Sequence, residues 1–378
     1  MSVQKICIIG SGLAGLSAAK ILSEEDITID LYLGNNKKNK IKSDNRTTAI
    51  SESSYQFIKQ KFNIKNIFWP CKEINLFFED LKKIKNFLSF KKKNLMYVFK
   101  NKELKKELNK KILQKKNIRL IKKNITGINY TDGSILLDKK FIFYDLIILC
   151  IGSHSKLYNK INQGRAIEKT YKEIAITTNI EHESKIDSVS QYFLKEGPFA
   201  ILPYDKKSFS VVWSVSSIFF NKNNKSIKKI LTSKIKILLN NPKIKKISNI
   251  QSFPIKLNLK KKYFKSNVLI LGDGLHSIHP MAGQGFNLVL RDIKKLNELI
   301  SKTLKLGLLF KNNFLLKDFY QARKPENTII GLGVNLTNIF FKDNKYFSPI
   351  RKTILENINN FKFIKKISQT ISDKGISI

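Results

Sequence analysis

The sequence is poor in several features that would assign a protein to a particular class. Its 378 residues include only 3 cysteines, Cys7, Cys71 and Cys150, which are too few and too scattered for a disulfide framework or a zinc site. No stretch approaches the roughly 18 uncharged apolar residues of a membrane-spanning helix, since Asp145 interrupts the most apolar one, Phe141–Ile151. The N-terminus enters a strand pattern without a signal-peptide pattern before it. We therefore expect a cytoplasmic protein with no transmembrane helix.

Acidic residues are also scarce, with 29 Asp and Glu against 70 Lys and Arg and a formal net charge of +41. Such an excess suggests binding to nucleic acid or to an anionic membrane. The lysines are spread over almost the whole chain among many asparagines and isoleucines, which is the pattern of an AT-rich genome. No nucleic-acid-binding module or basic cluster with interleaved aromatics is present, so we expect no specific nucleic-acid binding. Peripheral contact with an anionic bilayer, at about 1 kcal/mol per basic residue, fits better.

The first informative pattern lies at the start of the chain. Lys5–Ile9 predicts a strand, Leu13–Leu22 a helix and Ile27–Leu33 a second strand, with the sequence GSGLAG between the first two. This is the arrangement in which a GxGxxG turn binds a dinucleotide pyrophosphate at the helix start, and FAD is the usual occupant. The candidate cofactor-binding residues are Gly10, Gly12, Ala14 and Gly15. The carboxylate expected at the end of the second strand is missing, because that position falls near Leu33 and Asp30 comes too early.

A second glycine-bearing stretch, Val268–Asp292, reads VLILGDGLHSIHPMAGQGFNLVLRD. Its first four residues predict a buried strand, and an amphipathic helix is predicted over Phe286–Ile300. Glycines at Gly283 and Gly285 let backbone amides approach a bound group. The helix adds a positive end of roughly half an elementary charge. The sequence therefore predicts an anion-binding turn here.

This stretch resembles the second flavin motif, GD followed by HP and GQGxN, of the FAD-dependent aromatic hydroxylases related to p-hydroxybenzoate hydroxylase, most of all the branch acting on ubiquinone precursors. The resemblance implies that Asp273 holds the ribityl chain of FAD and that His279–Gly285 lies along the isoalloxazine ring. His276 and His279 have no evident third ligand or carboxylate partner, so we expect no metal. The flavin-binding residues implied in this stretch are Gly272, Asp273, Pro280, Ala282, Gly283, Gln284, Gly285, Phe286 and Asn287.

Further segments extend the resemblance to about residue 330. DNRTTAIS, from Asp44, resembles DxRxxALS and implies that Arg46 lies beside the flavin. CIGSHS, Cys150–Ser155, stands where the family shows ADGxxS, with Ile151 in place of an acid that helps hold the pyrophosphate region; His154 there is interpreted as a loop residue. KDFYQARKPEN resembles a segment ending YxxxRxxD, with Glu326 replacing the aspartate.

Two segments, Tyr171–Glu183 and Glu196–Val215, resemble consecutive antiparallel strands of the family's substrate domain. One sheet face, opposite the flavin, would roof an aromatic-substrate pocket, and its candidate lining residues, which could equally be core, are Phe199, Leu202, Pro203 and Trp213. Asn221–Lys246 is expected to be helical and solvated on one face. Ile330–Ser377 is also expected to be largely helical, either packing on the body, dimerising or lying on a bilayer.

The resemblance implies an α/β fold with a Rossmann-like FAD-binding domain of the p-hydroxybenzoate hydroxylase type, an inserted antiparallel-sheet substrate domain and a helical C-terminus. We expect the FAD-binding domain to comprise residues 1–70, 96–165 and 265–310. The substrate domain would comprise 71–95 and 166–264, and the helical region 311–378.

The implied function is that of an FAD-dependent monooxygenase hydroxylating a polyprenyl phenol in ubiquinone biosynthesis. By family analogy, NAD(P)H reduces the flavin transiently, and a flavin C4a-hydroperoxide formed with O2 transfers oxygen to the ring, so no side chain acts as a nucleophile. Expected partners are other quinone-biosynthesis enzymes, and the expected location is the cytoplasm, including the inner face of the cytoplasmic membrane. Two alternatives stay open: a hydroxylase of another phenol, or a flavin-binding scaffold whose catalysis was lost with the changes at Leu33 and Ile151.

Overall fold

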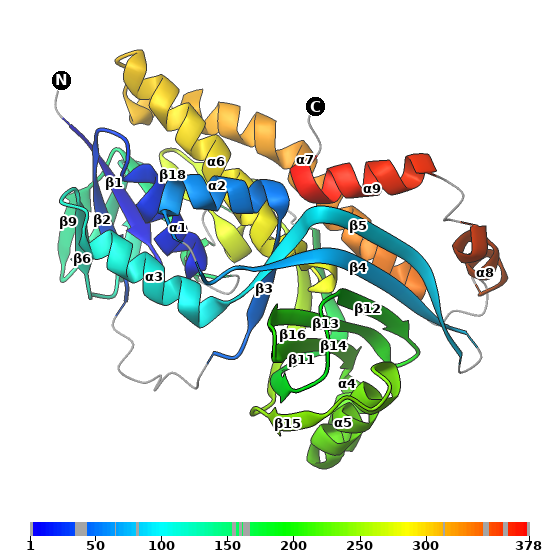
Figure 1. The fold of residues 1–378 in the computed structure, drawn as a ribbon. Coiled ribbons are helices and arrows are strands. Elements are labelled where there is room, and N and C mark those ends of the chain that lie inside the picture. The colour runs from blue at the N-terminus through cyan, green and yellow to red at the C-terminus, as the bar shows by residue number, and fades with distance from the viewer. Residues whose placement is uncertain are drawn as a thin grey trace.

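The computed structural model describes residues 3–375 apart from 35–43, 65, 81–82, 153–155, 159–160, 162–166, 313, 343–347 and 358–361. Two large sheets lie side by side, with long helices along the parallel sheet and beyond it (Figure 1). Within these ranges, none of the helices combines the length and apolar character that a membrane crossing requires.

The parallel sheet forms the nucleotide-binding half of the molecule. Its strand order is β17-β18-β10-β1-β2-β6, and only the β17–β18 pair is antiparallel. Helix α1 (Leu13–Leu22) packs against both α3 (Asn101–Leu113) and α6 (Gln284–Lys305). The Rossmann-like prediction is confirmed, and the strands are β1 (Gln4–Ile9), β2 (Ile27–Tyr32), β6 (Ile118–Ile121), β10 (Leu146–Leu149), β17 (Phe264–Lys265) and β18 (Val268–Ile270).

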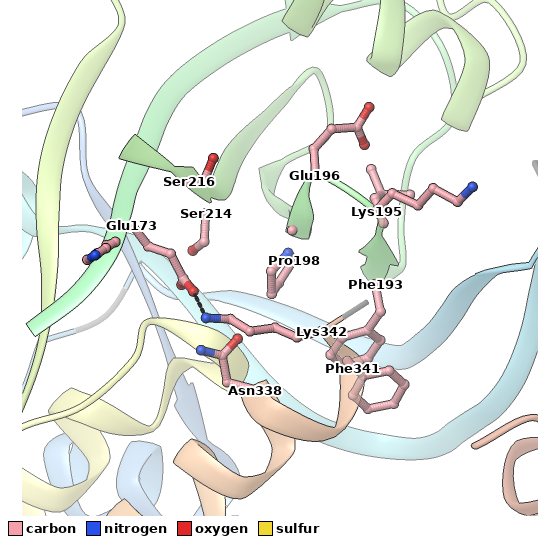
Figure 2. Close-up of a pocket in the computed structure, with 13 residues that line it drawn as sticks. Glu173, Phe193, Lys195, Glu196, Pro198, Ser214, Ser216, Asn338, Phe341 and Lys342 are labelled. Atoms are coloured by element: carbon pink, nitrogen blue, oxygen red, sulfur yellow. Dashed lines mark ion pairs between the residues drawn. The ribbon is translucent and has the colours of Figure 1, made fainter. Parts of the chain in front are cut away.

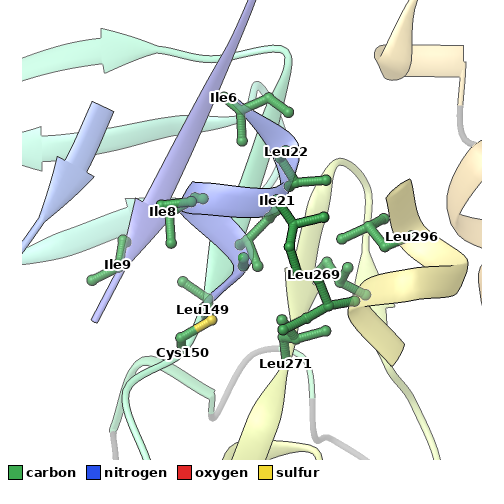
Figure 3. Packing of buried hydrophobic residues seen from close by; sticks show 14 of the residues in the cluster. Ile6, Ile8, Ile9, Ile21, Leu22, Leu149, Cys150, Leu269, Leu271 and Leu296 are labelled. Carbon is green, nitrogen blue, oxygen red and sulfur yellow. The ribbon is translucent and has the colours of Figure 1, made fainter. Parts of the chain in front are cut away.

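A single apolar core holds this half together. Strand β1 is buried between its two parallel neighbours, and aliphatic side chains of β1, β10 and β18 meet those of α1 and α6 (Figure 3). Strand β10 is wholly buried, as its uninterrupted apolar sequence LIIL requires. A separate three-stranded sheet of β7 (Gly127–Asn129), β8 (Ser134–Leu137) and β9 (Lys140–Phe143) packs against the same core. The predicted apolar run Phe141–Ile151 therefore divides between β9 and β10.

The second sheet has ten strands in the order β19-β16-β11-β14-β13-β12-β4-β5-β3, with β15 paired to β11. Every pair is antiparallel except β4 with β12. Helix α5 (Ile227–Leu238), which follows α4 (Ser217–Asn223), covers one face of its central strands. The strands are β3 (Thr47–Ser51), β4 (Trp69–Asp80), β5 (Lys83–Lys100), β11 (Ile167–His182), β12 (Val189–Leu194), β13 (Gly197–Asp205), β14 (Ser208–Ser216), β15 (Ile244–Ile247), β16 (Gln251–Leu259) and β19 (His276–Ser277).

The C-terminal region is helical, as predicted, with α7 (Phe314–Phe341), α8 (Ser348–Asn357) and α9 (Lys362–Lys374). The end of α9 packs on the body at the start of α2 (Glu52–Phe62). There the Ser53 backbone N–H donates to the Asp373 carboxylate at 2.8 Å, and the Arg291 guanidinium donates to the Asp373 carbonyl at 3.2 Å. The expected helix over residues 221–246 is wrong at its end, because 244–247 pair with β11 as β15.

Candidate functional site

The first glycine turn joins β1 to α1 and leaves the helix start open. A Cβ on Gly10, whose φ is +138°, would lie 2.2 Å from the Cys150 carbonyl oxygen, and one on Gly15 would lie 2.2 Å from the Gly10 oxygen. Both glycines are therefore required for α1 to pack on the sheet. Gly12 is different, because nothing lies within 4 Å of its Cβ position. It is the N-cap of α1 and has no side chain to accept a hydrogen bond from the helix amides, so the first amides can bind an anion.

The second glycine motif lies directly against the first. Gly272 has a φ of +75°, and a Cβ added to it would lie 2.9 Å from the Cβ of Ala14. Asp273 follows it and is exposed. At the start of α6, Gly283 has a φ of +62° and caps the helix without a side-chain bond. The Cβ position of Gly285 is empty to 4 Å, so this helix start too has room for a ligand.

The segment before β3 brings Arg46 to the same place. Its guanidinium forms a two-point ion pair with Asp44, at 2.9 Å for each contact, and its guanidinium carbon lies 5.3 Å from the centre of the Phe253 ring. The hydrogen bonds that Arg46 donates to Asp44 raise the pKa of Arg46 against the effect of burial, and the charge of Asp273 raises it further. Arg46 and Asp273 are therefore within electrostatic reach of each other. With its side chain 52% exposed, Arg46 remains accessible to a ligand.

Asn287 connects the flavin-motif loop to β3. Its amide oxygen accepts from the Ser51 backbone N–H at 3.0 Å, and its amide nitrogen donates to the Gly283 carbonyl at 3.0 Å. Phe286 packs edge-on to Phe99 at 6.2 Å. The Asn287 amide thus shapes the loop through contacts with protein. Pro280 is exposed and Gln284 is buried, whereas the Ala282 side chain lies outside the described part of the structure.

Two acid positions of the family pattern lack a carboxylate here. Asp30 is not the ribose partner, since it accepts from Arg119 at 2.8 and 2.7 Å and from Tyr144 at 2.6 Å. Leu33 follows β2 and Ile151 follows β10, and neither has an acid in its place. His154 and Ser155 lie outside the described residues.

Each histidine of the second motif has a carboxylate partner that sequence reasoning did not identify. His276 Nε2 lies 2.6 Å from Asp292 Oδ2, and Arg323 Nε donates to Asp292 Oδ1 at 2.7 Å. Burial alone would raise the pKa of Asp292, but the charges of Arg323 and His276 lower it. Glu326, which pairs with Arg323 on the same helix, also pairs with Arg291 of α6 at 3.3 Å, so the YQARKPE segment joins α7 to α6. The sequence feature that could have revealed this partner of His276 was Asp292, an acidic residue two turns into the predicted helix.

His279 has its own partner from the antiparallel sheet. Its Nε2 lies 3.0 Å from a carboxylate oxygen of Glu173 on β11, and the other oxygen of Glu173 pairs with Lys342 at the end of α7. Burial would raise the pKa of Glu173, but the bonds from His279 and Lys342 lower it to about 2. The residues that the structure describes contain no group of three metal-binding side chains. His276 and His279 are instead each paired with one carboxylate, Asp292 and Glu173.

The predicted pocket lining divides between the two faces of the antiparallel sheet. Phe199 and Trp213 are 0% exposed and pack in a cluster with α5, which favours the core alternative for both. Pro203 faces the same way by strand alternation. Leu202 lies on the other face, in a cluster with Ala49.

That second face looks onto the flavin-motif loop. Ala49, which packs with Leu202, is also the nearest neighbour of the Gly283 Cβ position, at 3.1 Å. On this face Thr177, Asn179 and Ser210 are at most 8% exposed, and each has a side-chain oxygen with no hydrogen-bond partner among the residues described. The face therefore combines apolar surface with unused hydrogen-bonding groups.

A cavity of about 360 Å³ opens farther along the same sheet (Figure 2). There the ends of β12 and β14, the start of β13 and the first half of β11 meet the end of α7. Phe193, one of its lining residues, packs in a cluster with Met281 of the flavin-motif loop. The cavity therefore adjoins that loop.

The fold and both glycine turns together define the class of protein. A model of the FAD-binding domain matches residues 141–307, which include the second turn. The chain is similar in sequence to monooxygenases and shares the fold of FAD-dependent ones, and its open helix starts fit FAD.

Within that class, the chain is similar to proteins of ubiquinone biosynthesis. It is 29% identical over 212 residues to the mitochondrial ubiquinone biosynthesis monooxygenase COQ6 of Dictyostelium discoideum, which covers 55% of this chain and 41% of that protein. It is 28% identical over 163 residues to the ubiquinone hydroxylase UbiL of Rhodospirillum rubrum, covering 42% of this chain and 38% of that protein. The similarity thus spans less than half of either relative.

The fold extends over the whole chain. The crystal structure of p-nitrophenol 4-monooxygenase PnpA from Pseudomonas putida DLL-E4 superposes with a TM-score of 0.78, covering 100% of this chain and 99% of that one. The two sequences are 12% identical, so the comparison establishes the architecture, with its parallel sheet, curved antiparallel sheet and C-terminal helices.

Proposed function

We propose that this protein is an FAD-dependent monooxygenase that hydroxylates the aromatic ring of a polyprenyl phenol in ubiquinone biosynthesis, with NAD(P)H as the reductant. The observation that carries the proposal is the contact of Gly272 with Ala14, which joins both glycine turns into one site. The two relatives that act in ubiquinone biosynthesis support the finer choice of substrate.

The residues have distinct roles in this proposal. The amides at Gly12 hold the pyrophosphate, Asp273 holds the ribityl chain, and Arg46 lies beside the flavin as a cation. The open start of α6 at Gly285 stabilises negative charge on the ring system. Bound FAD supplies the oxygen-transfer chemistry, while the antiparallel sheet covers the ring and excludes water.

The same three-part division belongs to the proposal, with the FAD-binding domain at 1–70, 96–165 and 265–310. Within the first of these ranges, β3 hydrogen-bonds to β5 of the antiparallel sheet. It therefore connects the two halves at the cofactor.

Peripheral membrane contact is also part of the proposal. Exposed apolar side chains recur along one face of α7 at helical spacing, and the net charge of +41 favours an anionic surface. These side chains, 36–63% exposed, are Ile329, Leu332, Leu336 and Ile339.

The decisive experiment uses purified FAD-loaded protein, NADPH, ¹⁸O₂ and 2-geranylphenol. The expected result is NADPH oxidation that depends on the phenol, with one ¹⁸O atom in the ring of the product. NADPH oxidation with no labelled product from this or a tail-free phenol would refute the hydroxylase. A protein that binds FAD but neither oxidises NADPH nor labels a phenol would favour the alternative of a flavin-binding scaffold, which the residues at Leu33 and Ile151 support.

A further inference from the structure

We propose that the cavity between the antiparallel sheet and the end of α7 binds the ring of the aromatic substrate, and that Asn338 recognises an oxygen substituent on that ring. This inference rests on the proposed function and deepens it. It assigns substrate recognition to α7, a helix outside the sheet on which the sequence placed the pocket.

Asn338 is the observation that points to a ligand. It lines the cavity, is 1% exposed, and has no hydrogen-bond partner for either its amide oxygen or its amide nitrogen within the described chain. A buried amide without partners destabilises a folded protein, because both groups lose their hydrogen bonds to water. A ligand that supplies an acceptor and a donor would restore both bonds.

The cavity walls fit an aromatic ring. Phe193 and Phe341 stack with ring centroids 3.5 Å apart and an interplanar angle of 13°, and with Leu194 and Pro198 they give the cavity an apolar side. A volume of about 360 Å³ lies at the lower end of the range for small-molecule sites. One ring with short substituents therefore fills it.

The polar side is fixed by a charged pair. Lys342 and Glu173 form an ion pair across the cavity wall next to Asn338 (Figure 2). Because Glu173 also binds His279, the cavity is tied to the flavin-motif loop from this side. Met281 of the same loop belongs to one apolar cluster with Phe193, which connects the cavity to the loop from its apolar side.

These contacts define the recognised chemistry. A phenol hydroxyl donates to the Asn338 oxygen and accepts from its nitrogen, whereas an alkyl benzene does neither. The cavity is therefore expected to select phenols over hydrocarbons of the same shape, because an unpaired amide penalises the wrong ligand.

The test measures binding separately from turnover. FAD-loaded protein without NADPH is titrated with 2-geranylphenol while the flavin absorbance spectrum is followed, and steady-state NADPH oxidation is measured in parallel. For Asn338→Leu we expect Kd and KM to rise at least tenfold with kcat changed less than threefold. We also expect the melting temperature of the phenol-free protein to stay level or rise, because the unpaired amide is gone. Thr337→Ala, on the exposed side of the same helical turn, is the matched control with wild-type values.

A second variant covers the case in which leucine does not fit. Asn338→Ala removes the amide without adding bulk, and the same tenfold loss of affinity is expected. Wild-type affinity in either folded variant overturns the inference while leaving the hydroxylase intact. A variant that melts much lower but binds normally also overturns it, since the amide is then structural. A wild-type protein that neither binds the phenol nor labels it with ¹⁸O removes the proposed function, and the inference falls with it.

Discussion

Replacing Gly12 by leucine should separate cofactor binding from folding. Nothing lies within 4 Å of the Cβ position of Gly12, and its φ of −81° and ψ of 176° suit any residue. The substitution should therefore lower the free energy of unfolding of the FAD-free protein by no more than about 1 kcal/mol, the usual cost of a poor N-cap. The new side chain would, however, occupy the space where the pyrophosphate meets the helix amides.

The size of the effect follows from linkage. FAD at a hundredfold its Kd stabilises the wild-type fold by about 2.7 kcal/mol. At roughly 2.1 cal/mol/K per residue, unfolding of a chain this long carries an entropy of about 0.8 kcal/mol/K, so FAD should raise Tm by about 3 °C. Gly12→Leu should show no such rise.

The assay is thermal unfolding of FAD-stripped protein with and without added FAD. Gly333→Leu is the matched control, since the Cβ position of Gly333 on α7 is equally open and lies away from the proposed cofactor groove. It should retain the full shift. A Gly12→Leu protein that binds FAD with wild-type affinity would show that the pyrophosphate does not lie at this helix start, and the reasoning would fail.

Three further perturbations test other contacts. Asp273→Ala should weaken FAD binding ten- to a hundredfold, for a lost charged hydrogen bond of about 1.5–3 kcal/mol, and a variant that purifies fully yellow would contradict the role. Arg323→Met should lower the free energy of unfolding in urea by about 3–5 kcal/mol, because it leaves Asp292 buried with one cation fewer; a loss below about 1 kcal/mol would disprove this anchor. Glu173 has a folded pKa of about 2 against an ordinary 4.5, so its stabilisation is full above pH 4.5 and is lost as pH falls toward 2. The advantage of wild type over Glu173→Gln in unfolding free energy, about 3 kcal/mol at most, should shrink over that window, and an advantage constant with pH would exclude this titration.

Both glycine turns could be predicted because their chemistry is local. Gly10 and Gly15 are needed for the packing of one helix on one strand, and the residues that impose this are neighbours in sequence. The α1 bounds agree with the predicted Leu13–Leu22 for the same reason. Strand β15 was missed because its sequence, IKKI, continues a lysine-rich helical pattern, and only pairing with β11 makes it a strand.

The pocket could not be predicted to the same depth. Alternation along β13 shows that Phe199 and Leu202 face opposite ways, but it does not show which face meets the flavin loop. Packing of α5 on one face decides this, and α5 comes later in the chain. The role of Asn338 could not be predicted from the sequence at all. An asparagine in a long predicted helix is expected to be solvated, and only packing against the sheet buries this one.

The contact between Ala14 and Gly272, two positions far apart in the sequence, sets the width of the cofactor groove. Gly272 cannot be replaced by a larger residue, because its φ is +75° and a Cβ added there would lie 2.9 Å from the Cβ of Ala14. Ala14 is the adjustable member of the pair, and each carbon added there would spread the two turns and loosen their joint grip on a molecule that spans both. Relatives that carry a bulkier residue at this first position should therefore show a compensating shift in the backbone of the second turn.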